Sequence, residues 1–218
     1  MQTPVATAPD YLDLQIPAGL TLLDVPVVDA TNETLKGYGE LVSDRHNHTV
    51  EIARWPAQGW RPVDTDSGDE AGTVEGTFRF WWEGDVLRGQ NEAVGGDYIL
   101  GYSADPASAS REQASGPRDH VYLWHCNYHP DGGQVFYPMN GEPFVTPLAL
   151  PGDDIKPDDF VCFRFDGSCG LYIHPGIWHE GVFPTVETGS FFDKQGRVHA
   201  RVSVDFAREF GLLLKVPL

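Results

Sequence analysis

The chain has 218 residues, a length that fits one large domain or two small ones. Hydrophobic residues make up 41% of it and charged residues 22%, a globular balance that excludes extensive disorder. Fifteen basic and 32 acidic residues give a formal charge of −17, which opposes phosphate backbones and anionic lipid. We therefore expect no nucleic-acid and no membrane partner. A small anionic substrate requires a pocket in which Arg, His or amide groups are concentrated.

The first ten residues, the length of the apolar runs and the cysteines indicate the cellular compartment that we expect. Residues 1–10 lack the basic and apolar regions of a secretory signal, and no apolar run is long enough to span a membrane. The three cysteines, Cys126, Cys162 and Cys169, are odd in number and form no Cys-x-x-Cys pair. We therefore expect free, core cysteines in a cytoplasmic protein.

The predicted elements are short strands separated by turns rich in Gly and Pro. Short helices are expected at 31–37, where Thr31 is the N-cap, and at 108–114, and an exposed acidic loop at 61–76. In chain order, strands are expected at 78–82, 98–102, 121–124, 160–165, 170–174 and 200–206. In the last of these, Val202, Val204 and Phe206 share one face, and Arg201, Ser203 and Asp205 share the other.

Many short strands with few helices favour an all-β barrel, closed or built of two sheets, with residues 1–218 as a single domain. A barrel of this kind encloses a ligand-sized cavity more readily than a flat sheet does. The tryptophans at 55, 60, 81 and 82 suit either a subunit interface or packing of the outer elements.

The first segment with recognisable chemistry runs from Asn127 to Gln134. On a strand, Asn127 and His129 point to the same face, and His125 lies one step along that face. The Pro-Asp-Gly-Gly stretch that follows His129 predicts a hairpin, so Gln134 is expected to begin the return strand beside His129.

The spacing N-x-H-x4-Q-x6-G, which ends at Gly141, resembles the first cupin motif. The stretch from Gly170 to His179 resembles the second, with Gly176 making the tight turn that returns His179 to the barrel mouth. Asn127 and Gln134 replace the usual His and Glu. Because neutral amides are poor ligands for divalent metals, the usual metal site is degraded.

Together, His129-Pro130-Asp131-Gly132-Gly133-Gln134 and His174-x-Gly176-x-Trp178-His179 resemble the signatures of the ureidoglycolate lyase family. The resemblance is strongest between residues 122 and 184. It departs from the family at Asn127 and Tyr128, where the family often has Glu and Arg. It implies a cupin-type double-stranded β-helix (jelly-roll) barrel, commonly a homodimer. It also implies an enzyme that releases urea from ureidoglycolate and leaves glyoxylate, late in allantoin and purine catabolism.

The resemblance suggests a role for each candidate residue. His129 and His179 form the acid/base pair, because imidazole titrates near neutral pH, and Gln134 holds the ureido group. Substrate contacts are expected from Asn127, His174, His125, Tyr137 and Trp178. Glu180 is expected to point away from the site. The acid/base chemistry requires no metal, although His129, Gln134 and His179 could hold a weakly bound divalent ion that polarises the hydroxyl.

Two other functions remain open. One is a metal-dependent cupin isomerase, dioxygenase or lyase acting on another small hydroxy or keto acid, with His125, His129 and His179 as ligands. The other is a small-acid-binding cupin without catalysis, because a fold alone does not fix an activity. Outside the two segments, His46 and His48 are expected at the surface or cavity rim, Tyr172 beside the cavity, and His199 on a solvated strand.

Overall fold

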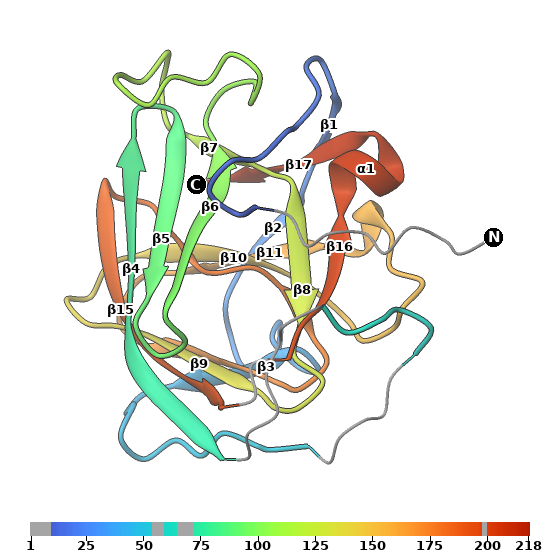
Figure 1. The fold of residues 1–218 in the computed structure, drawn as a ribbon. Helices are drawn as coiled ribbons and strands as arrows, with labels where there is room; N and C mark the ends of the chain where they lie inside the picture. The colour runs from blue at the N-terminus through green and yellow to red at the C-terminus, as the bar shows by residue number, and fades with distance from the viewer. Residues whose placement is uncertain (1–9, 54–58, 65–71, 198–199) are drawn as a thin grey trace.

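The computed structural model describes residues 10–53, 59–64, 72–197 and 200–218, and Trp55 and His199 lie outside these ranges. Within them the regular elements are nearly all strands, as predicted (Figure 1). The helical elements of the described residues are one α-helix, α1 (Phe206–Phe210), and one 3-10 turn (Pro157–Asp159). No helix in the described ranges is long and apolar enough to cross a membrane.

The strands form two mixed sheets, mostly antiparallel, in a jelly-roll-like sandwich. The larger sheet has the order β1 (Thr21–Asp24), β17 (Leu212–Pro217), β7 (His120–Leu123), β6 (Gly96–Tyr102), β5 (Val86–Asn91), β4 (Thr73–Glu83), β15 (Thr188–Gly196), β9 (Gln134–Pro138), β12 (Gly170–Ile173) and β3 (Gly39–Val42). The smaller has the order β16 (Val202–Asp205), β8 (His125–Tyr128), β13 (Trp178–His179), β10 (Phe144–Ala149), β11 (Val161–Phe165) and β2 (Val27–Asp29), with β14 (Phe183–Pro184) also paired to β10.

All six expected strands are present, but both expected helices are wrong. In 31–37, Thr31 Oγ1 accepts a hydrogen bond from the Thr34 amide, as an N-cap would, yet the chain makes turns and leaves through Gly37 at φ 90°. In 108–114, the Asp85 carboxylate accepts a hydrogen bond from the Ser110 amide, and the segment forms a loop in place of a helix. Side-chain acceptors thus compete with helical hydrogen bonds.

The end of the last expected strand also differs. Val202 and Val204 are buried on one face, as predicted, whereas Phe206 already belongs to α1. The Asp205 carboxylate ends the strand by accepting a hydrogen bond from the Arg208 amide at 2.9 Å, as an N-cap does.

The turn after His129 is not the predicted hairpin. Strand β8 pairs with β16 and β13 in one sheet, whereas β9 pairs with β15 and β12 in the other, so the turn carries the chain between sheets. Gly133 allows this crossing, because a Cβ there would lie 2.5 Å from the Ile173 carbonyl oxygen. Gln134 still begins the next strand and faces the site from the opposite sheet.

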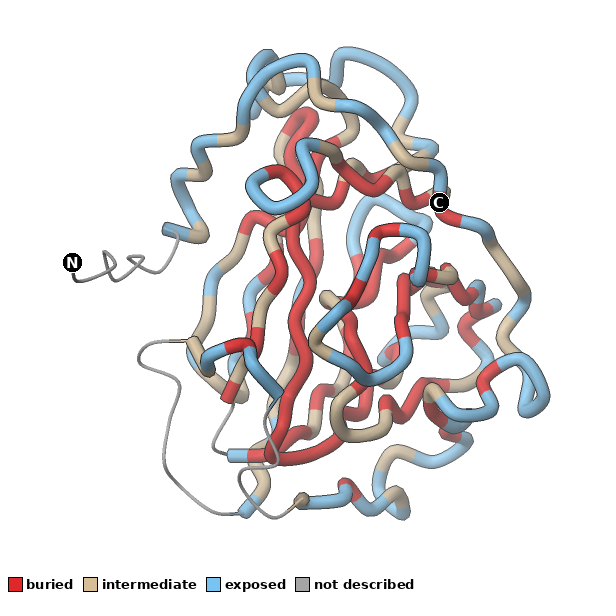
Figure 2. Tube along the Cα trace, turned by 90° about the vertical axis from the view of Figure 1, so that its right-hand side faces the viewer, coloured by how far each residue is buried: buried red, intermediate tan, exposed pale blue. Residues whose placement is uncertain are grey.

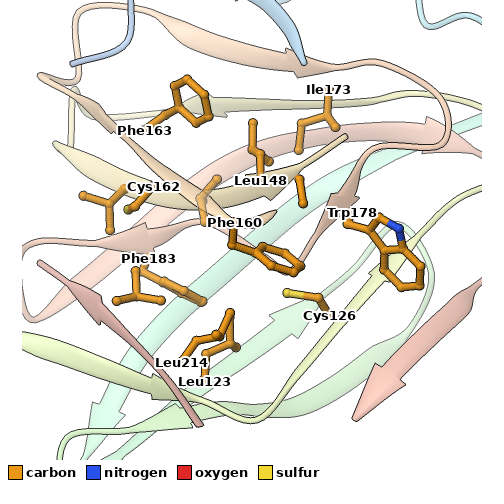
Figure 3. Close-up of a cluster of buried hydrophobic side chains, with 14 of the residues drawn as sticks. Leu123, Cys126, Leu148, Phe160, Cys162, Phe163, Ile173, Trp178, Phe183 and Leu214 are labelled. Atoms are coloured by element: carbon orange, nitrogen blue, oxygen red, sulfur yellow. The ribbon is translucent and has the colours of Figure 1, made fainter. Parts of the chain in front are cut away.

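The space between the sheets holds an apolar core (Figures 2 and 3). Buried strands run through the centre of the molecule, and exposed residues lie in the peripheral loops. Cys126 and Cys162 are buried among Phe160, Trp178 and Phe183, and all three cysteines are free, as expected. The core therefore fills one part of the sandwich and leaves the polar cavity described below in another.

Candidate active site

A polar cavity of about 40 Å³, partly open to solvent, lies between the two sheets. Strands β4, β5, β6 and β9 of the larger sheet and β8 and β13 of the smaller contribute to it. Its lining is Tyr11, Phe78, Asn91, Tyr98, His125, Asn127, His129, Gln134, Phe136, His179, Glu180, Gly181 and Arg201.

Strand β8 supplies the polar wall through its alternation. His125 and Asn127 face the cavity and His129 follows on the same side, whereas Cys126 points into the apolar cluster (Figure 3). The predicted common face is therefore confirmed. Because these side chains project from a paired strand, their positions relative to one another are fixed.

His129 is buried and has a defined tautomer. Its Nδ1 lies 2.9 Å from the Ala200 carbonyl oxygen, which can only accept, so Nδ1 carries the hydrogen. The neutral ring then has its lone pair on Nε2. Burial lowers the pKa of His129 and outweighs the nearby Asp131 carboxylate, which acts to raise it. His129 is thus a neutral imidazole suited to accept a proton.

His179 lies beside it, with the two ring centroids 5.1 Å apart. Gly176, at φ 79°, makes the predicted turn before this residue. His179 Nδ1 is 2.7 Å from the Ile177 carbonyl oxygen and Nε2 is 3.1 Å from Gln134 Oε1. Burial and the neighbouring His129 lower the pKa of His179 to about 3, so this ring is also neutral near pH 7.

Gln134 connects His179 to a buried carboxylate that the sequence did not reveal. Its Nε2 donates to Asp193 Oδ1 at 2.7 Å, and Asp193 Oδ2 accepts from Asn91 at 2.9 Å and Gln195 at 2.7 Å. Burial raises the pKa of Asp193 to about 6 although these three amides favour its charged form. Asp193 lies on β15, where nothing in the local sequence distinguishes it from a solvated residue.

A second carboxylate enters the site at Glu180, which does not point away as expected. Strand β13 ends at His179, so alternation no longer governs the next residue, and Glu180 Oε2 lies 2.7 Å from His125 Nδ1. His125 Nε2 and Asn127 Oδ1 are buried without a hydrogen-bond partner, and both residues line the cavity. Unpaired polar atoms of this kind are available to hydrogen-bond a ligand or water in the cavity.

Arg201 is the one Arg or Lys among the described lining residues, and sequence reasoning missed it. Its side chain is 17% exposed, its Nε has no hydrogen-bond partner, and Asp64 Oδ2 lies 3.8 Å from that atom. Its guanidinium carbon lies 5.1 Å from the Tyr11 ring centroid. The alternation around Val202 put Arg201 on a polar face, but only the fold reveals that this face meets the cavity.

Three predicted substrate contacts lie outside the cavity lining. His174 is 3.6 Å from the Glu40 carboxylate, and the Tyr137 hydroxyl donates to the Ser43 carbonyl oxygen at 3.5 Å. Trp178 is fully buried, and its indole donates to the Gly152 carbonyl oxygen at 2.8 Å. Tyr172, His46 and His48 are also absent from the lining, and the His48 ring packs on Tyr172 at 4.6 Å.

The donor set is a poor fit for a divalent metal. In the described part of the chain, no three or more His, Cys, Asp or Glu side chains are arranged to hold a metal ion. The predicted metal ligands, His129, Gln134 and His179, would offer two imidazole nitrogens and one neutral amide oxygen. That amide oxygen already contacts His179. We therefore derive no step through a metal.

Comparison with known proteins supports the family resemblance of the segments 127–134 and 170–179. Residues 102–203 match the family model described as ureidoglycolate lyase. A ureidoglycolate lyase of Azotobacter vinelandii is 34% identical over 70 residues, covering 31% of this chain and 42% of that protein. One of Stutzerimonas stutzeri is 36% identical over 70 residues, covering 31% and 41%.

A ureidoglycolate lyase of Salmonella paratyphi B is 47% identical over 57 residues, which cover 25% of this chain and 34% of that protein. The chain thus spans less than half the length of the curated relatives it matches. The matched range includes His125, His129, Gln134, His179 and Arg201. The predicted resemblance is therefore confirmed: residues 102–203, which supply most of the cavity lining, match the ureidoglycolate lyase family.

Proposed function

We propose that this protein is a ureidoglycolate lyase that cleaves the C–N bond of ureidoglycolate to give glyoxylate and urea. The observation that carries the proposal is one cavity, lined mostly by residues of the family-like range, that joins two neutral histidines to a partly buried guanidinium. The relatives' names indicate the same reaction.

The reaction requires only that one proton move. Ureidoglycolate carries a hydroxyl and a ureido nitrogen on the same carbon. Loss of the hydroxyl proton allows the carbonyl to form while the C–N bond breaks, and the departing nitrogen takes up a proton. The net proton count is unchanged, so a base that is neutral at the working pH is sufficient.

His129 is our candidate for that base. Its Nδ1–H is held by the Ala200 carbonyl oxygen, so Nε2 is the atom that would take the hydroxyl proton when substrate replaces its contact with Gln134. The same imidazole can return that proton to the departing nitrogen, because both atoms are bonded to one carbon. The lowered pKa of His129 favours proton release.

The remaining lining groups match the rest of the molecule. Arg201 would bind the substrate carboxylate, because guanidinium and carboxylate form paired hydrogen bonds. His125 Nε2 and Asn127 Oδ1 would accept hydrogen bonds from the ureido N–H groups, which satisfies both orphaned atoms. His179 Nε2–H, which is 3.1 Å from Gln134 Oε1, would be shared with the ureido oxygen, which gains negative charge as the C–N bond breaks.

The products test this proposal. Purified protein is incubated with racemic ureidoglycolate, and glyoxylate, urea and ammonia are measured, with and without a chelator. Glyoxylate and urea in equal amounts, above the spontaneous rate and without ammonia, are expected in both arms. Ammonia in place of urea would indicate attack on the amide instead. Activity lost in chelator would favour the alternative metal-dependent cupin, and binding without turnover the non-catalytic one.

We further propose that residues 1–218 form one cupin-like domain, that two copies form a homodimer in the cytoplasm, and that the enzyme serves purine catabolism. Trp60, which is 66% exposed, is an apolar surface suited to a subunit contact. Light scattering on the purified protein tests the dimer, and the mass of one chain would overturn it.

A further inference from the structure

The contacts of His179 conflict with its neutral state. Its Nδ1 faces the Ile177 carbonyl oxygen and its Nε2 faces Gln134 Oε1, and both oxygens can only accept hydrogen bonds. A neutral ring carries one hydrogen and can satisfy one of them. A turn of the Gln134 amide would remove the conflict, because its NH₂ group would then donate to Nε2.

Asp193 blocks that turn. Its Oδ1 accepts the Gln134 NH₂ at 2.7 Å, and exchanging the amide oxygen and nitrogen would place oxygen against oxygen. Asp193 is itself fixed, because Asn91 and Gln195 both donate to its Oδ2. Asp193 is fully buried and Gln134 is 3% exposed, so water cannot easily replace these partners.

The position of the Gln134 oxygen beside His179 is therefore fixed in two ways. The Gln134 backbone is paired on β9 with both β12 and β15, and its NH₂ group is hydrogen-bonded to Asp193. The competing Ile177 oxygen lies in the turn that precedes His179, outside any strand. The Gln134 side chain also contacts His129, but the one hydrogen of that ring is held on Nδ1 by the Ala200 carbonyl oxygen. A buried acceptor left without a donor costs about 1–3 kcal/mol, so the fixed oxygen favours a hydrogen on His179 Nε2. This gives the two neighbouring histidines opposite tautomers, since His129 carries its hydrogen on Nδ1.

We propose that Asp193 is a positioning residue which, through the Gln134 amide, keeps a hydrogen on His179 Nε2 and so makes His179 a donor toward the cavity while His129 remains the acceptor. The substitution Asp193→Asn tests this. The oxygen of the new Asn side chain can keep the hydrogen bonds from Asn91 and Gln195. The NH₂ group of the new Asn then faces Gln134. The Gln134 amide then turns, and the His179 hydrogen moves to Nδ1.

The readout is the tautomer of His179, observed by ¹⁵N–¹H correlation NMR on histidine-labelled protein without substrate. The His179 signals are identified by their loss in His179→Gln. We expect Nε2–H in the wild type, Nδ1–H in Asp193→Asn, and Nε2–H in the matched control Gln195→Met. This control removes a donor to Asp193 but leaves its bond to Gln134. His129 should remain Nδ1–H throughout.

A wild-type Nδ1–H tautomer, or an Asp193→Asn variant that keeps Nε2–H, would overturn the proposal. If Asp193→Asn does not fold, Gln134→Met removes the same acceptor and takes its place. The spectra require no turnover, so they are independent of the proposed lyase activity. Only the kinetic consequence rests on that activity: kcat is expected to fall roughly 10- to 100-fold in Asp193→Asn with little change in KM.

Discussion

Arg201→Met removes the positive charge from the cavity and keeps much of the side-chain volume. Arg201 is the one Arg or Lys in the described lining, and its side chain is 17% exposed. Hydrogen bonds to charged groups contribute roughly 1.5–3 kcal/mol. Each 1.4 kcal/mol is a factor of ten, so kcat/KM should fall roughly 10- to 150-fold. The loss should be mainly in KM, because the carboxylate does not change in the reaction.

The assay is glyoxylate release over a range of ureidoglycolate concentrations, together with calorimetric binding of glycolate. Arg208→Met is the matched control, because Arg208 lies on α1 with a side chain 63% exposed and does not line the cavity. Urea unfolding of both variants separates binding from folding, since Arg201 also contacts the Tyr11 ring. Unchanged KM and unchanged glycolate binding in a folded Arg201→Met would refute the carboxylate assignment.

Three further substitutions test separate parts of the account. Asn127→Leu removes the orphaned acceptor, so KM should rise about 2- to 10-fold, as for one neutral hydrogen bond, in steady-state assays. Glu180→Gln weakens the hydrogen bond to His125, and kcat/KM should fall roughly 10-fold, as for one hydrogen bond to a charged group. Asp85→Asn should lower the free energy of unfolding at pH 7 by about 2 kcal/mol. Burial acts to raise the pKa of Asp85, but hydrogen bonds from Ser115, Ser110 and Ser103 lower it below its usual value. The charged form is thus the stabilising one, and this loss should shrink as the pH of the urea titrations falls below about 4.

The sequence predicted the parts of the site that depend on local alternation. His125, Asn127 and His129 share a face because the period of a strand is two residues, and Gly176 turns the chain before His179 because glycine tolerates positive φ. The Pro-Asp-Gly-Gly stretch correctly indicated a turn, but a turn signal does not specify which sheet receives the next strand. Gln134 therefore faces the histidines from the opposite sheet.

The missed residues depend on long-range packing. Asp193 lies on β15 and Arg201 directly before β16, at polar positions that look solvent-facing in sequence. Only the strand order brings Asp193 to Gln134 and Arg201 to the cavity. Glu180 was misjudged because alternation was extended past the end of a two-residue strand. Trp178 and His174 were grouped with His179 by sequence proximity, although their side chains contact Gly152 and Glu40 instead.

The most direct test of the central claim compares wild type with His129→Asn under identical conditions. The measurement is the rate of urea release from ureidoglycolate, corrected for spontaneous breakdown. Without an imidazole at this position the proton has no carrier, so kcat should fall by roughly 10²- to 10⁴-fold while glycolate binding is retained. Urea release at the wild-type rate from folded His129→Asn would contradict the account.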